Sequence, residues 1–271
     1  MTATTSLSEK AERWGALWGS RADDWALAEE QQLPTYEEAI DRLGIGPGRR
    51  VLEVGCGSGV FLRAAADRGA QVFGLDASEA LLGLARSRVP EADLRRGDLQ
   101  FLPYADDSFD VVAGFNSFFF ASDMVEALRE AGRVAKPGAA VVIQVWGRPE
   151  KCDLEAMKHA IEPFLPPPDP NVPRGSALWQ PGVLEGIAAE AGLTPGEMFD
   201  ISWGYELADE DALARMLLSA GGILDVVGSG REHEVRTAIV DAMAPYRRPD
   251  GGYTLENEWH YLLTTSRRDQ T

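Results

Sequence analysis

The chain has 271 residues, with 26 Lys and Arg against 43 Asp and Glu, and a formal net charge of −17. This balance argues against a nucleic-acid ligand or an anionic membrane surface, because both are bound mainly through basic side chains. The N-terminus has no secretory apolar segment, and no stretch reaches the ~18 apolar residues of a membrane span. The two cysteines suit neither a disulfide framework nor a metal cluster. We therefore expect a cytoplasmic protein without a metal site.

The first part of the chain, residues 1–46, is predicted to be helical. Trp14 and Trp18 lie one helical turn apart, and a further helix is expected over residues 36–43. Because no strand pattern appears before residue 50, we predict that this segment is a helical lid on the domain that follows, residues 47–147.

The most informative motif is Val51-Leu52-Glu53-Val54-Gly55-Cys56-Gly57-Ser58-Gly59. It is an apolar strand that ends in an acid and three alternating glycines, directly before a helical pattern. Glycines accept positive φ and have no Cβ, so the backbone can lie against a ligand. A dinucleotide loop, G-x-G-x-x-G, would need its third glycine where Val60 stands. The spacing therefore argues against a dinucleotide.

Further markers follow this loop in one order, and they predict a parallel sheet with helices on both faces. A carboxylate that ends the second strand of a βαβ unit can accept hydrogen bonds from both hydroxyls of a ribose. The ends of such strands meet in one crevice, where ligands bind. The markers are a strand over 71–76 that ends in Asp76, Gly97-Asp98-Leu99 after a short strand, a turn and strand over 106–114, and Lys136-Pro137-Gly138, which is expected to break a helix before a strand over 139–145.

Residues 10–146 resemble the small-molecule branch of class I S-adenosyl-L-methionine (SAM)-dependent methyltransferases, the methyltransferase-11 type that includes quinone-methylating enzymes. The resemblance implies a Rossmann-like, doubly wound α/β sheet of seven strands with strand seven antiparallel, SAM as cofactor and a small-molecule methyl acceptor. In that family the first acid and the glycines hold the methionine part of SAM, the second acid binds the ribose, and the third binds the adenine amine. The matching cofactor positions are Glu53, Gly55, Cys56, Gly57, Gly59, Asp76, Ala77, Asp98, Leu99 and, near the sulfonium, Asn116.

Residues 148–271 are expected to complete the sheet and to insert a helical cap over the acceptor. In this fold the last two strands form a hairpin, which a long helical excursion interrupts here. The expected elements are helices over 153–162 and 180–191, a semi-rigid proline-rich connector over 163–173, strand six over 197–203, the excursion over 209–245 and the last strand over 259–265.

A catalytic residue is not required, because the sulfonium of SAM is an activated methyl donor and placing the acceptor in line supplies much of the rate. A general base matters only when the acceptor must lose a proton early. His159, in the helix before the proline-rich connector, is the candidate base. His233 lies in a charged run and His260 in the last strand, where solvated and packed roles are the simpler interpretations.

Aromatic residues indicate the kind of acceptor. They precede the first strand and follow the fourth and fifth strands, at the ligand-binding end of the sheet. An apolar cavity with few polar groups suits a hydrophobic or aromatic small molecule. The residues predicted to line it are Trp18, Trp25, Phe118 and Trp146.

Two functional hypotheses share these motifs. The first is methyl transfer to O, N or C of a small metabolite. The second is a non-methylating enzyme that uses bound SAM as an electrostatic catalyst for a rearrangement or cyclisation. A regulatory SAM-binding protein or a macromolecular substrate fits less well, given the intact motifs and the acidic charge. The acceptor and the oligomeric state are not set by the sequence.

Overall fold

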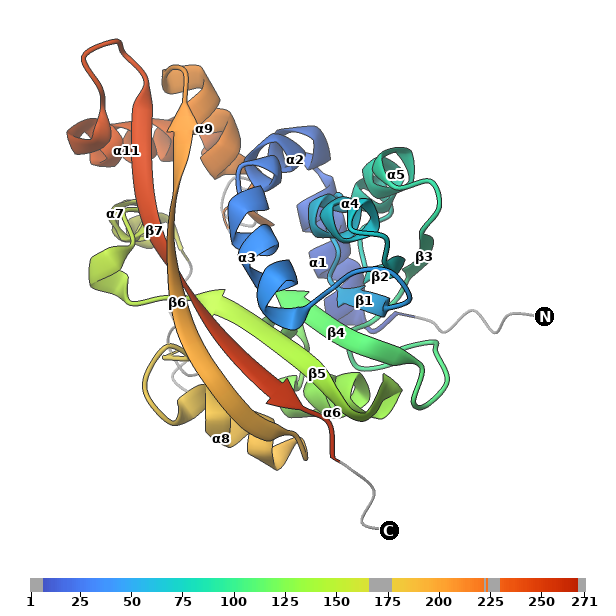
Figure 1. Ribbon diagram of the computed structural model, residues 1–271. Helices are drawn as coiled ribbons and strands as arrows, with labels where there is room; N and C mark the ends of the chain where they lie inside the picture. Colours follow the sequence, from blue (N-terminus) through green and yellow to red (C-terminus); the bar gives the residue numbers. More distant parts are fainter. Residues whose placement is uncertain (1–6, 166–176, 222, 224–229, 268–271) are drawn as a thin grey trace.

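The computed structural model describes residues 7–165, 177–221, 223 and 230–267. Its strands form one sheet in the order β3-β2-β1-β4-β5-β7-β6 (Figure 1). Strand β7 runs antiparallel to β5 and β6, while the pairs among β1 to β5 are parallel. The predicted doubly wound sheet with an antiparallel seventh strand is confirmed.

The bounds of the elements agree closely with the periodicity of the sequence in the first half of the chain. The strands are β1 (Arg50–Val54), β2 (Gln71–Asp76), β3 (Asp93–Arg96), β4 (Phe109–Phe115), β5 (Ala135–Trp146), β6 (Thr194–Leu207) and β7 (Tyr253–Thr265). The α-helices are α1 (Glu9–Gly19), α2 (Ala22–Glu30), α3 (Leu33–Leu43), α4 (Val60–Asp67), α5 (Glu79–Arg88), α6 (Met124–Val134), α7 (Leu154–Ile161), α8 (Val183–Glu190), α9 (Glu210–Ser219) and α11 (Glu232–Met243).

Both faces of the parallel sheet are covered by helices. Helices α3, α4 and α5 contribute to the apolar cluster on one face, and α6 and α8 contribute to the cluster on the other. The apolar residues of β1, such as Leu52 and Val54, are completely buried. Burial on two faces explains why β1 is a continuous apolar run rather than an alternating one.

The ends of β6 and β7 extend beyond the parallel sheet and carry a separate group of helices (Figure 1). Tyr205, Leu207, Tyr253 and Leu255 from these ends share one buried cluster with α7, α9 and α11. Both strands are therefore longer than the predicted segments 197–203 and 259–265, because their outer residues are buried by the helices of the excursion.

The prediction that Lys136-Pro137-Gly138 separates a helix from the fifth strand is wrong. Helix α6 ends at Val134 and β5 begins at the next residue, Ala135. The ladder pairs Phe109 with Ala135 and then Val111 with Ala140, so the tripeptide lies in an irregularity of the ladder. A strand can contain proline at such a bulge, where no ladder hydrogen bond is needed from its nitrogen.

The helices predicted for the C-terminal half are confirmed where the structure describes them. Helices α7 and α8 occupy the segments expected to be helical, and α9 and α11 lie within the excursion over 209–245. Most of the proline-rich connector and residues 222 and 224–229 lie outside the described residues. No helix of the described part of the chain is both long and apolar enough to span a membrane.

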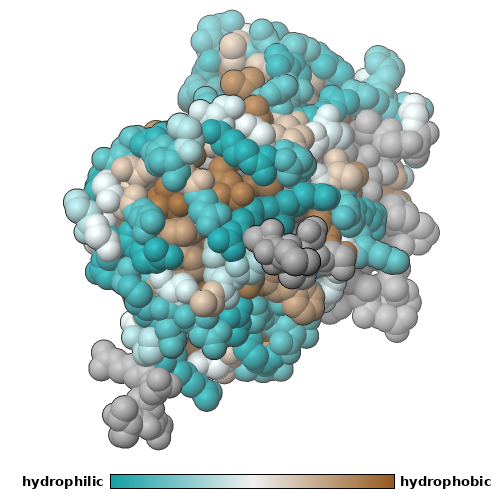
Figure 2. Space-filling view, turned by 90° about the vertical axis from the view of Figure 1, so that its right-hand side faces the viewer, coloured by the Kyte–Doolittle hydropathy of each residue, from teal (hydrophilic) through white to brown (hydrophobic). Residues whose placement is uncertain are grey.

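The surface of the molecule is largely hydrophilic. Figure 2 shows one face, on which hydrophilic residues predominate and apolar residues gather in smaller patches between them. Most charged side chains of the described residues take part in exposed ion pairs such as Arg63–Asp67 and Arg42–Glu38. Such pairs contribute only ~0–1 kcal/mol each, so the buried clusters carry the stability.

Candidate active site

A cavity lies at the carboxyl ends of β1, β2 and β4, where they meet the N-terminal helices. The part of it that water-sized molecules can occupy measures about 180 Å³, and it opens to solvent on one side. Its lining is acidic along the ends of the strands and aromatic on the side of α1, α2 and the turn after β4.

The loop between β1 and α4 forms the wall of the cavity with backbone alone. The N–H groups of Gly55 and Cys56 both donate to the carbonyl of Leu75, at 2.7 and 3.0 Å. Gly57 has φ +50, and a Cβ added to it would lie 2.8 Å from a carboxylate oxygen of Glu29. The loop therefore needs glycine at this position for its conformation and for the approach of an acidic side chain.

Asp76, the last residue of β2, holds the two turns that border the cavity. Its Oδ2 accepts the N–H of Gly57 at 2.9 Å, and its Oδ1 accepts the N–H of Ser78 at 2.8 Å. Burial raises the pKa of Asp76, and these N–H donors act in the opposite direction. A carboxylate has about four acceptor positions, so two remain for a bound diol.

Asp98 joins the site to the beginning of α1. Its Oδ2 accepts the hydroxyl of Ser8 at 2.5 Å, and its Oδ1 accepts the N–H of Gln100 at 3.0 Å. The same Ser8 hydroxyl accepts the N–H of Ala11 and so caps α1. Lys10 adds a second tie, because its Nζ donates to the carbonyl of Ala121 at 2.7 Å. The first turn of the N-terminal helices is thus attached directly to the cavity.

Three carboxylates from different elements face the acidic end: Glu29 from α2, Glu53 from β1 and Asp76 from β2. Burial raises the pKa of Glu29 to about 7. Burial also raises the pKa of Glu53 well above its usual range, and the neighbouring charges of Glu29 and Asp76 add to the effect. The buried Oε2 of Glu53 has no hydrogen-bond partner among the described residues. A cationic or hydrogen-bond-donating ligand would stabilise these buried carboxylates.

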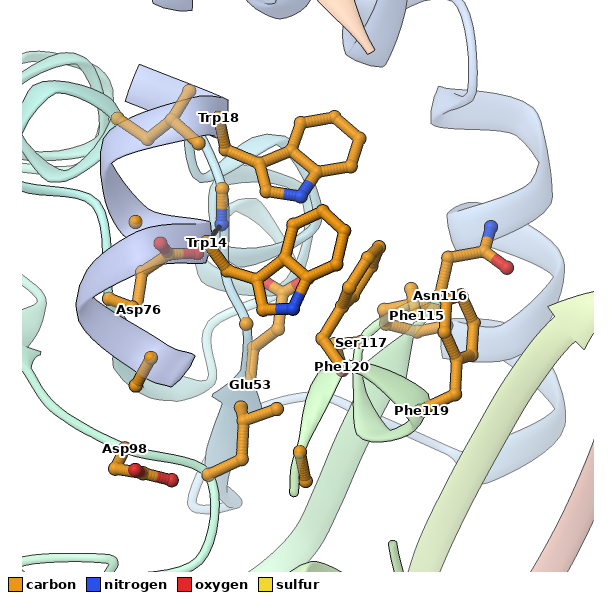
Figure 3. Close-up of a pocket in the computed structure, with 18 of the residues that line it drawn as sticks. Trp14, Trp18, Glu53, Asp76, Asp98, Phe115, Asn116, Ser117, Phe119 and Phe120 are labelled. Carbon is orange, nitrogen blue, oxygen red and sulfur yellow. Dashed lines mark hydrogen bonds between the residues drawn. The ribbon is translucent and has the colours of Figure 1, made fainter. Parts of the chain in front are cut away.

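The opposite wall of the cavity is aromatic. Trp14 and Trp18 project from α1 toward Phe120 (Figure 3), with ring centroids 4.7 and 5.8 Å from it. Trp18 also packs against Trp25 of α2, with centroids 4.6 Å apart. Such edge-to-face pairs fix the rings relative to one another. A flat or apolar molecule would therefore meet a preformed surface.

The turn after β4 brings the aromatic and polar walls together. Asn116 has φ +50, a left-handed conformation that asparagine tolerates better than most residues. Its N–H donates to Gln144 at 3.0 Å, and its buried Oδ1 has no partner among the described residues. The chain then enters a short 3₁₀ helix, Phe118–Phe120, from which Phe119 and Phe120 face the cavity.

The structure brings most of the predicted site residues to this cavity and leaves four elsewhere. The buried side chain of Cys56 points back into the sheet, since a Cβ on Gly74 would lie 2.8 Å from its Sγ. Gly59 caps α4 and packs on Ala85 of α5. The other two, Phe118 and His159, are treated below. The predicted residues that line the cavity are Glu53, Gly55, Gly57, Asp76, Ala77, Asp98, Leu99, Asn116, Trp18, Trp25 and Trp146.

Phe118 fills the core instead of the cavity. It is 1% exposed, and its ring lies 2.3 Å from the place where a Cβ on Gly114 would stand. In a 3₁₀ turn each residue is rotated by ~120° from the next, so neighbouring rings point in different directions. The aromatic run was expected at this end of the sheet, but the residues of the run that line the cavity are Phe119 and Phe120.

His159 is exposed on α7 and does not line the cavity. The substitution His159→Ala is expected to change the maximal rate by less than about twofold. It should change the free energy of unfolding by less than ~0.5 kcal/mol, as for other exposed substitutions. The rate and a urea unfolding curve measure both. A loss of more than tenfold in rate with unchanged stability would restore His159 as a base candidate.

Several lining residues were not predicted as site residues: Glu29, Gln32, Tyr36 and Trp259 among them. Glu29 is 4% exposed although it belongs to the polar run Glu29-Glu30-Gln31-Gln32, which reads as a solvated helix face. Gln32 donates to the hydroxyl of Tyr205 at 3.0 Å, and Tyr205 belongs to the cluster buried by α7, α9 and α11.

Comparisons with known proteins agree with this geometry. A model of the methyltransferase domain matches residues 52–143, which begin in β1 and end in β5. The ubiquinone biosynthesis O-methyltransferase of Hahella chejuensis is 33% identical over 209 residues, which cover 70% of this chain and 86% of that protein. The chain belongs to the class I SAM-dependent methyltransferase family.

Two further proteins are similar to this chain. A solved complex between the Trm112 methyltransferase activator of Haloferax volcanii and a methyltransferase has a TM-score of 0.60 and 22% identity, covering 97% of this chain and 100% of the solved chain. This likeness supports the fold. An uncharacterised protein of Mycobacterium tuberculosis is 35% identical over 171 residues, and the match covers 60% of each chain. The chain thus spans about three-fifths of the length of that relative.

Proposed function

We propose that this protein transfers the methyl group of SAM to O, N or C of a small apolar or aromatic metabolite. The observation that carries the proposal is one cavity with two unlike walls. Carboxylates at the ends of adjacent parallel strands form one wall, and aromatic side chains from α1, α2 and the turn after β4 form the other.

The acidic wall fits the cofactor that the family uses. Asp76 has acceptor positions to spare for the two hydroxyls of a ribose, in addition to the two N–H groups that it already accepts. Asp98 and Leu99 follow β3 and would meet the adenine amine and ring. Glu53 and the loop glycines would face the methionine part, where the unpartnered Oε2 of Glu53 can accept a hydrogen bond.

When bound, SAM would supply a methyl group that is already activated by its sulfonium. The residues of this chain would then act by position and by exclusion of water. Phe120, Trp14 and Trp18 would hold a planar acceptor against the cofactor, since a reacting pair ~3–3.5 Å apart and in line gains most of the available rate. The lining carboxylates belong to the acidic wall, apart from the aromatic residues, so we expect an acceptor that needs no early deprotonation by the protein.

The charge of the chain supports a small-molecule acceptor over a nucleic acid. The net charge is −17, and Lys10 at the mouth is already bound to a backbone carbonyl. Both cysteines are free and buried, which accords with a reducing compartment such as the cytoplasm.

The test uses methyl-labelled SAM, purified protein and a metabolite extract of the source organism, with high-resolution mass spectrometry of the products. We expect a labelled product with wild-type protein and none with Asp76→Ala. Its mass would identify the acceptor. If the protein binds SAM but labels nothing, while another metabolite is converted, the proposal fails in favour of a non-methylating rearrangement or cyclisation.

A further inference from the structure

The N-terminal helices bring a buried acid to the cofactor end of the cavity. Glu29 lies at the C-terminal end of α2, is 4% exposed and lines the cavity. Its Oε2 accepts the N–H of Ser58 at 2.9 Å. The carboxylate thus reaches out of its own helix to the glycine loop, a part of the chain 29 residues away.

With the contact between Glu29 and Ser58, every backbone N–H group of the glycine loop, residues 55–59, has an acceptor. The N–H groups of Gly55 and Cys56 bind Leu75, that of Gly57 binds Asp76, that of Ser58 binds Glu29, and that of Gly59 binds Cys56. A loop with free N–H groups attracts anions. This loop instead offers carboxylate oxygens, so its surface selects for a cation.

The charged groups around Glu29 also favour a cationic ligand. Glu53 and Asp76 line the cavity beside it, and so does Tyr36 of α3. Arg88, the cation that acts on Glu29 among the described residues, is held by the carbonyl of Ser58 at 2.7 Å and by Glu30. Arg88 does not line the cavity, and Lys10, which does, donates its Nζ to the carbonyl of Ala121.

Glu53 provides an independent sign that a ligand belongs here. It is 2% exposed, and its Oε2 has no hydrogen-bond partner among the described residues. A buried carboxylate oxygen without a partner is costly, and a bound donor removes that cost. Glu29 and Glu53 come from different elements, α2 and β1, and both line the cavity.

We infer that Glu29 is a specificity residue that, together with Glu53, binds the α-ammonium group of the amino-acid part of SAM and so couples cofactor binding to the position of the N-terminal helices. The inference rests on the proposed SAM site. The α-ammonium would occupy the gap between the two acids, and the contact between Glu29 and Ser58 would keep α2 on the loop.

The test is calorimetric titration with S-adenosylhomocysteine and with its deaminated analogue, in which hydrogen replaces the α-amino group. The variant is Glu29→Gln, which keeps an oxygen for the N–H of Ser58 and has the same shape. The control is Asp23→Asn, which removes an exposed carboxylate of the same helix. A thermal melt establishes that each variant is folded.

We expect Glu29→Gln to weaken S-adenosylhomocysteine by about 30-fold, because a buried charge-assisted hydrogen bond is lost, and to change the affinity for the deaminated analogue by less than about threefold. Asp23→Asn should leave both affinities unchanged. An equal loss for both ligands, or no loss for either, overturns the inference, since Glu29 would then only support the loop or be unimportant. Failure of wild-type protein to bind either nucleoside would overturn the SAM site itself.

Discussion

Gly55→Ala is expected to destabilise the protein by about 2–5 kcal/mol, a large part of the ~5–15 kcal/mol that holds a typical domain together. Two costs add. Gly55 has φ +77, a left-handed conformation that costs an L-residue with a Cβ about 1–2 kcal/mol. The new Cβ would also lie 2.4 Å from the Cβ of Ser117, and overpacking of this kind costs about 1–3 kcal/mol.

Ser117 cannot easily move away. Its hydroxyl donates to the carbonyl of Val54 at 2.6 Å, and it is 5% exposed. The substitution would therefore push apart the ends of β1 and β4, where the candidate cofactor residues lie. A loss of affinity for S-adenosylhomocysteine should accompany the loss of stability.

The matched control is Gly83→Ala, in the interior of α5. A Cβ there meets nothing within 4 Å, and its φ is not positive. This change should stabilise the protein by about 0.5–1 kcal/mol, because alanine loses less freedom than glycine in a helix. Urea unfolding of the three proteins measures the difference. A midpoint for Gly55→Ala equal to that of the wild type would contradict the strain that the structure assigns to this turn.

The order of the markers in the sequence was enough to predict the sheet and the place of the acidic wall. Asp76 and Asp98 each follow a strand, and strands of a doubly wound sheet end at the same edge. Their position therefore follows from topology, before any side-chain detail. The same holds for Asn116, which follows β4 and lines the cavity.

Residues whose role depends on packing between distant segments escaped prediction. Glu29 is buried only because α2 lies on the glycine loop, which no local pattern around residue 29 indicates. Phe118, Phe119 and Phe120 are consecutive residues of a 3₁₀ turn, and their equal hydrophobicity cannot indicate which ring faces the core. The outer parts of β6 and β7 depend in the same way on the helices that bury them.

Asp76→Ala is expected to weaken the binding of S-adenosylhomocysteine by at least about 100-fold, or ~3 kcal/mol. The loss of two charge-assisted hydrogen bonds to a ribose, at about 1.5–3 kcal/mol each, accounts for this size. The change also removes the acceptor for the N–H groups of Gly57 and Ser78, so the two turns beside the cavity lose their link. Isothermal titration calorimetry measures the affinity.

A second variant and a control separate the direct effect from the loss of the link. Asp76→Asn keeps the size of the side chain, but its amide nitrogen must face the N–H of Gly57 or of Ser78, so one donor meets another. It should bind almost as weakly as Asp76→Ala. Asp67→Ala, which removes an exposed partner of Arg63, should bind as the wild type does. An affinity of Asp76→Ala within about fivefold of the wild type would show that this carboxylate does not hold the ribose. The cavity would then have to be assigned to a different ligand.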